Sequence, residues 1–115
     1  MTVEQIMQVI RADEFADVTF SGGDPMFQPE AFATLAQTIK QQTRKNIWCY
    51  TGYTYEQILN NPLRLKLLHL VDVLVDGPYI EAQHDPDLLF RGSRNQRLID
   101  IPASLHAGKV TLFAQ

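Results

Sequence analysis

Three short apolar segments alternate with segments of helical periodicity along this chain, and each apolar segment runs into a glycine. The apolar segments lie at residues 17–21, 46–51 and 71–76, and we predict each as a strand. The last has the apolar density of a strand that is covered on both faces. Strands that alternate with helices build parallel sheets through right-handed crossovers. The alternation therefore predicts an α/β fold with a mostly parallel sheet.

Two capping boxes and a proline mark where the intervening helices begin. Thr2 with Gln5 and Thr54 with Gln57 have the spacing at which side chain and backbone cap each other. Pro29 suits the first turn of another helix. Further along the chain we expect a short leucine-rich helix after residue 62, a polar loop over 81–91, a fourth strand at 96–101 and a fifth at 110–113.

Size and composition restrict the class of protein. The chain has 115 residues, of which 45% are hydrophobic, so we expect one globular domain over residues 1–115. No apolar run approaches the ~20 residues of a membrane span, and the net charge of −3 argues against a nucleic-acid partner. Cys49, the single cysteine, excludes an internal disulfide and indicates a reducing compartment. We expect a cytoplasmic protein with neither nucleic-acid nor membrane partners.

The ends of the three predicted strands carry glycine beside a polar side chain. These ends are Gly22-Gly23-Asp24, Thr51-Gly52 and Asp76-Gly77. In parallel α/β sheets, ligands bind at the carboxyl ends of the strands, which meet at one edge. The pattern therefore predicts a shared small-molecule site.

Asp24 is the strongest candidate for a ligand contact. The two glycines before it let a ligand approach the backbone, because no Cβ stands in the way. Pro25 biases Asp24 toward extended geometry. The carboxylate would then have a fixed direction and lie beside backbone groups that no side chain covers. This arrangement suits a ligand with an ammonium group, such as the amino end of a free amino acid. The alternative is a tight turn from strand to helix that binds nothing.

The other two strand ends allow a functional and a structural interpretation. Thr51 and Gly52 offer a hydroxyl and close backbone approach, or simply end a strand. Asp76 could contact a ribose hydroxyl or a cation, or cap the turn at Gly77. Asp72 lies four residues before Asp76, and we interpret it as structural, paired with a nearby basic residue.

For the remaining residues that could bind a ligand or a metal, the sequence gives weaker indications of function. An adenine ring could stack on the aromatic residues around the second strand end, or these could belong to the core. Three arginines within residues 91–97 could bind carboxylates or phosphates, or form an exposed basic loop. The three histidines lie too far apart for a metal site, and Cys49 is expected to be buried and inert.

Four blocks of the sequence, taken together, resemble the radical S-adenosylmethionine (SAM) enzymes that activate glycyl-radical enzymes. They match best the branch that activates anaerobic ribonucleoside-triphosphate reductase, in order and approximate spacing. The blocks are TFSGGDP at 19–25, IWCYTGY at 47–53, DVLVDG at 72–77 and FRGSRNQR at 90–97. The resemblance implies a partial (β/α) barrel of the radical SAM type.

The resemblance also implies roles for residues at the strand ends. In this family the Gly-Gly-acid loop binds the amino group and backbone of the methionine moiety of SAM, and polar residues occupy the next two strand ends. Tyr50 and Gly77 depart from the commoner pattern beside those ends. The implied cofactor-binding residues are Gly22, Gly23, Asp24, Thr51, Gly52 and Asp76.

The family also binds a [4Fe-4S] cluster, through a Cys-x3-Cys-x2-Cys loop that follows its first strand. This sequence has no such loop. We therefore expect the chain to be the C-terminal portion of an activase, without the N-terminal strand and cluster loop. On that expectation it holds no metal ligand and no catalytic residue, and is inactive by itself.

By this resemblance, the full-length protein is an oxidoreductase that cleaves SAM reductively at its cluster. It then installs a glycyl radical on anaerobic ribonucleoside-triphosphate reductase, and a flavodoxin-type protein is a possible electron donor. Two alternatives stay open: an activase of another glycyl-radical enzyme, and a catalytically silent module that binds a partner. A three-cysteine loop encoded upstream of Met1 would favour an activase over the silent module.

Overall fold

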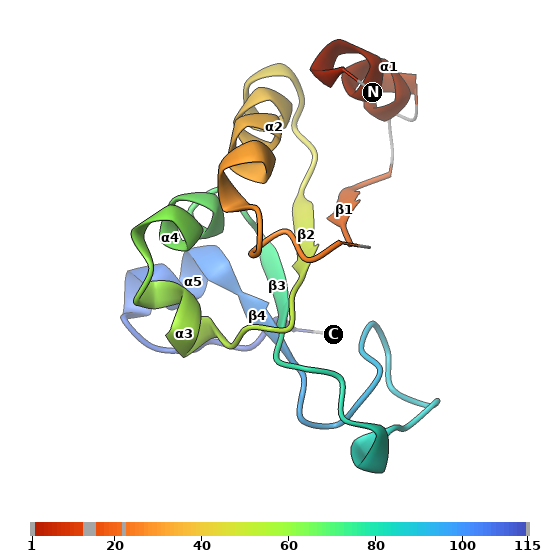
Figure 1. The fold of residues 1–115 in the computed structure, drawn as a ribbon, viewed down its shortest axis with the longest axis vertical. Helices are drawn as coiled ribbons and strands as arrows, with labels where there is room; N and C mark the ends of the chain where they lie inside the picture. Colours follow the sequence, from red (N-terminus) through yellow and green to blue (C-terminus); the bar gives the residue numbers. More distant parts are fainter. Residues whose placement is uncertain (1, 13–15, 22, 115) are drawn as a thin grey trace.

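The computed structural model describes residues 2–12, 16–21 and 23–114. Helices and strands alternate over the first two thirds of the chain, as the sequence predicts (Figure 1). The elements are α1 (Val3–Ala12), β1 (Val18–Phe20), α2 (Pro29–Gln42), β2 (Ile47–Tyr50), α3 (Tyr55–Leu59), α4 (Pro62–Leu68), β3 (Val73–Asp76), the 3-10 turn η1 (Glu81–Gln83), β4 (Arg97–Asp100) and α5 (Ile101–Ala107).

The four strands form one sheet in the order β1-β2-β3-β4. β1 pairs with β2 and β2 with β3 in parallel, whereas β4 is antiparallel to β3. The mostly parallel α/β sheet is thus confirmed. The last strand reverses direction because the chain returns to the sheet through a loop at one end, without the helical crossover that a parallel neighbour requires.

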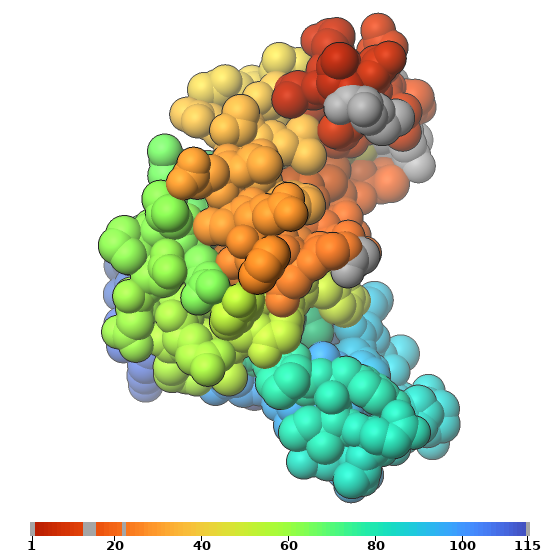
Figure 2. Space-filling model, viewed as in Figure 1, coloured from red at the N-terminus to blue at the C-terminus, as the bar shows by residue number. Residues whose placement is uncertain are grey.

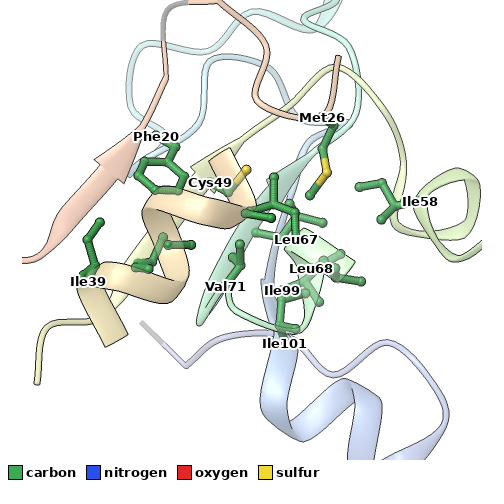
Figure 3. Close-up of a cluster of buried hydrophobic side chains, with 14 of the residues drawn as sticks. Phe20, Met26, Ile39, Cys49, Ile58, Leu67, Leu68, Val71, Ile99 and Ile101 are labelled. Carbon is green, nitrogen blue, oxygen red and sulfur yellow. The ribbon is translucent and has the colours of Figure 1, made fainter. Parts of the chain in front are cut away.

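The α-helices of the described residues contribute to a core on one face of the sheet, and Figure 3 shows side chains from α2 to α5 in it. Phe20 of β1 and Cys49 of β2 point into this core, where they meet side chains such as Ile39 of α2 and Leu67 of α4. Leu74 of β3 belongs to the same buried cluster. The alternating burial of β2 follows from this arrangement, because every second side chain faces the helices. The helix layer thereby fixes the direction in which each strand end points.

The opposite face of the sheet has a smaller cluster of its own. Val73, Val75 and Leu98 are buried there, with Trp48 and Phe113 packed against them. The Trp48 ring also lies 5.1 Å from the ring of Phe90, centroid to centroid. β3 is therefore buried on both faces, as its apolar sequence predicts.

The C-terminal part differs from the expectation. No strand forms at 110–113: Leu112 makes only an isolated bridge to Ile99. Helix α5 was not predicted; it begins at an Asp100 cap that accepts from the Ala103 amide, and it ends at Gly108, which has φ +71°. An aspartate cap followed by a proline in the first turn was the signal for this helix.

Residues 79–95 form an arm that projects from the body of the molecule (Figures 1 and 2). The arm carries η1 and an antiparallel bridge between His84 and Ser93. Among the described residues, no helix has the length and apolar character needed to cross a membrane.

Candidate functional site

The ends of β1, β2 and β3 meet at one hollow of about 240 Å³. This is the convergence that the three glycine-containing strand ends predict. Of the predicted site residues, Asp24, Thr51 and Gly52 line it, whereas Gly22 lies outside the described residues. The lining consists of Ser21, Asp24, Tyr50, Thr51, Gly52, Gly77, Tyr79 and Gln96.

The Asp24 carboxylate joins two of the strand ends. Its Oδ1 accepts a hydrogen bond from the Met26 amide at 2.9 Å, and its Oδ2 accepts one from the Gly52 amide at 2.8 Å. The side chain is half-buried. A carboxylate has about four lone-pair sites, so the two backbone donors found among the described residues leave it capacity for further hydrogen bonds. Asp24 is thus fixed by the fold and still able to accept from a ligand.

Backbone contacts hold the loop after β2 against the end of β3. The Thr51 amide donates to the Val75 carbonyl at 3.1 Å, and the Gly77 amide donates to the Tyr53 carbonyl at 2.9 Å. The Thr51 hydroxyl accepts from the Tyr53 amide at 3.1 Å. Gly77 has φ +90°, a value that residues other than glycine rarely adopt. This geometry gives Gly77 a structural reason to be glycine.

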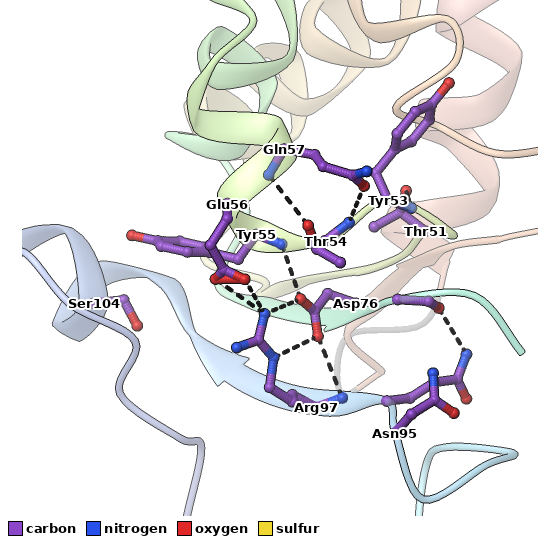
Figure 4. Close-up of polar contacts among 12 residues, drawn as sticks. Thr51, Tyr53, Thr54, Tyr55, Glu56, Gln57, Asp76, Asn95, Arg97 and Ser104 are labelled. Atoms are coloured by element: carbon purple, nitrogen blue, oxygen red, sulfur yellow. Dashed lines mark hydrogen bonds and ion pairs between the residues drawn. The ribbon is translucent and has the colours of Figure 1, made fainter. Parts of the chain in front are cut away.

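Asp76 is placed differently from Asp24, although it also ends a strand (Figure 4). Its side chain is 1% exposed and does not line the hollow. The carboxylate accepts from the Tyr55 amide at 2.8 Å, and from the Arg97 amide, Nε and Nη2 at 3.3, 3.1 and 2.5 Å. With four protein donors, Asp76 acts here as a tertiary link, and the idea that it contacts a ligand stays a prediction.

The arginines of residues 91–97 mostly serve the fold. Hydrogen bonding to Asp76, together with that to Glu56, raises the pKa of the Arg97 guanidinium, and burial opposes that rise. Arg91 donates to the Gln96 carbonyl at 2.6 Å, which ties the base of the arm together. Arg94 has an exposed side chain. The exposed basic loop of the sequence analysis therefore describes only Arg94, because Arg91 and Arg97 are half-buried and bonded within the fold.

Several residues of the hollow escaped the sequence analysis. Tyr79 and Gln96 reach it from the two ends of the arm. The Gln96 side chain accepts from the Gly92 amide at 2.9 Å and donates to the Gly77 carbonyl at 3.1 Å, so it joins the arm to the third strand end. Gln96 belongs to one of the four resembling blocks, and that membership was the available signal.

A second concavity lies on the outside of the helix layer. A groove of about 360 Å³ runs between α2 and α4 and is lined by Glu30, Ala33, Thr34, Gln37, Leu63 and Lys66. It is larger than the hollow but includes no strand end. In parallel α/β sheets the carboxyl ends of strands are the usual place for ligands, so the hollow is the better candidate.

A model of one protein family matches residues 1–99, and its description is 4Fe-4S single cluster domain. That match covers most of the chain. The chain belongs to this family. Its resemblance to activating proteins of anaerobic ribonucleoside-triphosphate reductase is confirmed by curated relatives that carry this name.

Three of these relatives show the extent of the similarity. The protein of Vibrio cholerae is 42% identical over 82 residues, and that of Pasteurella multocida is 36% identical over 83 residues. Each alignment covers 69% of this chain and 52% of the relative. The protein of Enterobacteria phage T4 is 35% identical over 100 residues, 84% of this chain and 61% of the relative.

The chain spans about half the length of the first two relatives. No solved structure matches it significantly.

The cluster in the family description does not fit the residues of this chain. Iron–sulfur clusters are held by several cysteine thiolates. The sequence has one cysteine, Cys49, which is fully buried on the helix side of β2. Burial, with a smaller contribution from the charge of Asp24, raises the pKa of the Cys49 thiol to about 12. Among the described residues, no group of three histidine, cysteine or acidic side chains could hold a metal ion.

Proposed function

We propose that this chain supplies the SAM-binding edge of an activating enzyme for anaerobic ribonucleoside-triphosphate reductase. The observation that carries the proposal is the meeting of three strand ends at one hollow, with Asp24 on its wall. Similarity to activating proteins of this reductase supports the reductase as partner. The choice of SAM follows from the resemblance of the four sequence blocks to radical SAM activases. Under this proposal the four-stranded sheet is part of a larger (β/α) barrel.

The methionine end of SAM carries an ammonium group and a carboxylate. The hollow offers a hydrogen-bond acceptor for the ammonium group. Asp24 would accept from the ammonium through the lone pairs that Met26 and Gly52 leave free. At Gly23, an added Cβ would meet nothing within 4 Å, so the space beside this backbone is open. Charge-assisted hydrogen bonds of this kind contribute roughly 1.5–3 kcal/mol each.

The activity proposed for the whole protein is reductive cleavage of SAM that leads to a glycyl radical on the reductase. A [4Fe-4S] cluster would supply the electron, and its ligands would come from outside the residues present here. The residues of this chain would orient SAM and form part of the surface that meets the reductase. A flavodoxin-type protein is the proposed electron donor.

Asp24→Asn tests the proposal, because it keeps the size of the side chain and removes its charge. In the full-length, cluster-loaded protein we expect SAM affinity to fall by about 10- to 150-fold, as measured by calorimetry. Glu56→Gln is the matched control, since it removes a carboxylate that does not line the hollow. Equal SAM affinity in the parent and Asp24→Asn proteins, with both folded by circular dichroism, would refute the proposal.

A second candidate function is a cluster-free module that docks on a partner without chemistry. The observation that favours it is the buried, protonated Cys49 as the single thiol of the sequence. Anaerobic reconstitution of the full-length protein with iron and sulfide, followed by an assay for 5′-deoxyadenosine, separates the two. Formation of 5′-deoxyadenosine rules out the silent module.

A further inference from the structure

Arg64 lies on α4, in the helix layer, and is not part of the wall of the hollow. Its side chain is half-buried and makes two specific contacts. The Nε atom donates to the Met26 carbonyl at 2.8 Å. The guanidinium carbon lies 3.9 Å from the centroid of the Tyr53 ring, within the range of a cation–π interaction.

These two contacts fall on two different loops, and each lies beside a donor to Asp24. Met26, whose carbonyl binds Arg64, also donates its amide to Asp24 Oδ1. Tyr53 directly follows Gly52, whose amide donates to Asp24 Oδ2. A single planar guanidinium thus joins the two backbone segments that orient the carboxylate.

We propose that Arg64 is a positioning residue for the SAM site: it holds the loops after β1 and β2 at the separation where Asp24 receives both amide donors. The part that concerns SAM rests on the function proposed above. A flat, delocalised fork suits this task, because it donates along its edge and stacks through its face. Lysine suits this task less well, since its ammonium is a compact point charge without a flat face to stack on the ring.

Arg64 could instead contribute only to general helix packing. The two roles differ in what they predict for the Gly52 amide, whose NMR signal reports the hydrogen bond to Asp24 without any ligand. If Arg64 positions the loops, its loss shifts that signal. If it only packs α4, its loss lowers the melting temperature and leaves the Gly52 amide signal in place.

The test compares Arg64→Met with Lys66→Met. Both variants are on α4 and replace a cation by an apolar side chain, and Lys66 is exposed and away from the hollow. In the ligand-free full chain, we expect Arg64→Met to shift the Gly52 amide signal and Lys66→Met to leave it unchanged. In the full-length, cluster-loaded protein, we expect Arg64→Met to weaken SAM binding about tenfold, and Arg64→Lys to recover only part of it.

An unshifted Gly52 amide in Arg64→Met overturns the proposal, whatever happens to thermal stability. Should Arg64→Met fail to fold, Arg64→Gln removes the charge and keeps a polar side chain, and the same shift of the Gly52 signal is required of it. A parent protein that does not bind SAM, together with a shifted Gly52 signal in Arg64→Met, refutes the function proposed above and supports the positioning role. A shifted signal with unchanged SAM affinity overturns the claim that Arg64 acts on the SAM site.

Discussion

Asp24 follows β1 and Asp76 is the last residue of β3 in the same, mostly parallel sheet, yet their surroundings differ. Asp24 is held by two backbone amides on the wall of the hollow, where it keeps accepting capacity. Asp76 is buried beneath Arg97 and accepts from four protein donors. Among the described residues, the strand-end carboxylate that pairs with a cation of the protein is a structural link, whereas the one held by backbone amides keeps capacity to accept further hydrogen bonds.

Arg97→Met should cause the largest loss of folding stability, because it removes the cation that pairs with Asp76. It would leave a buried carboxylate without its charged partner, and breaking such a pair is strongly destabilising. Because the Arg97 side chain is 34% exposed, we expect the low end of the range, about 3 kcal/mol, in urea unfolding. The double variant Asp76→Asn/Arg97→Met should recover part of this loss. A single variant as stable as the parent would show that the pair does not hold β3 to β4.

The pH dependence of folding stability above pH 9 tests the burial of Cys49, whose thiol also feels the charge of Asp24. The folded-state pKa of Cys49 is raised to about 12 by burial and by Asp24, against 9.0 for the free thiol. The folded state therefore keeps a proton that the unfolded state loses above pH 9. The contribution of the protonated Cys49 thiol to the free energy of unfolding is fully present below pH 9. It falls by about 1.4 kcal/mol per pH unit toward pH 12.

Stability measured over this pH range in the parent and in Cys49→Ala tests the effect. The fall should be shallower in the variant, because the other titrating groups are common to both proteins. Identical slopes would mean that Cys49 does not stay protonated by burial.

Asp24→Asn should have a smaller effect on stability than Arg97→Met. One of the two backbone amides would lose its carboxylate acceptor, but the site is half-buried and water can replace part of the interaction. We expect a loss of about 1 kcal/mol in urea unfolding. A loss as large as that of Arg97→Met would mean that Asp24, like Asp76, is first of all a structural link.

Glu56→Gln should have the smallest effect. Glu56 shares Arg97 with Asp76, with Oε1 at 2.7 Å from Nη2, but its side chain is 58% exposed. Exposed ion pairs contribute about 0–1 kcal/mol, so we expect at most a few tenths in the same unfolding assay. A loss comparable to that of Arg97→Met would show that the exposed carboxylate, and not Asp76, carries the interaction.

Local signals in the sequence were enough to predict much of the fold. The two predicted capping boxes form, with Thr2 and Gln5 capping α1 and Thr54 and Gln57 capping α3. Asp72 pairs with Lys40, in agreement with its interpretation as structural. The capping boxes depend on a spacing of a few residues, which can be read from the sequence, whereas the basic partner of Asp72 could not be named from it.

Tertiary pairings are what the sequence left undetermined. Nothing near Asp76 in the chain indicates that Arg97, on an antiparallel strand beyond the arm, covers its carboxylate. The same holds for Arg64, whose partners Met26 and Tyr53 lie in two other loops. The convergence of the strand ends could be predicted because a parallel sheet imposes it, whereas the choice among side chains at those ends depends on the packing of the whole chain.

The most direct test of the account follows backbone amide signals while SAM is added to the full-length protein. We predict that the amides of Gly52, Gly77 and Gln96 shift together, because they belong to one hollow. The amides of Ala33 and Gln37, in the groove between α2 and α4, should stay in place. Shifts confined to that groove, or none at Gly52 and Gly77 when SAM saturates the protein, would contradict a SAM site at the strand ends.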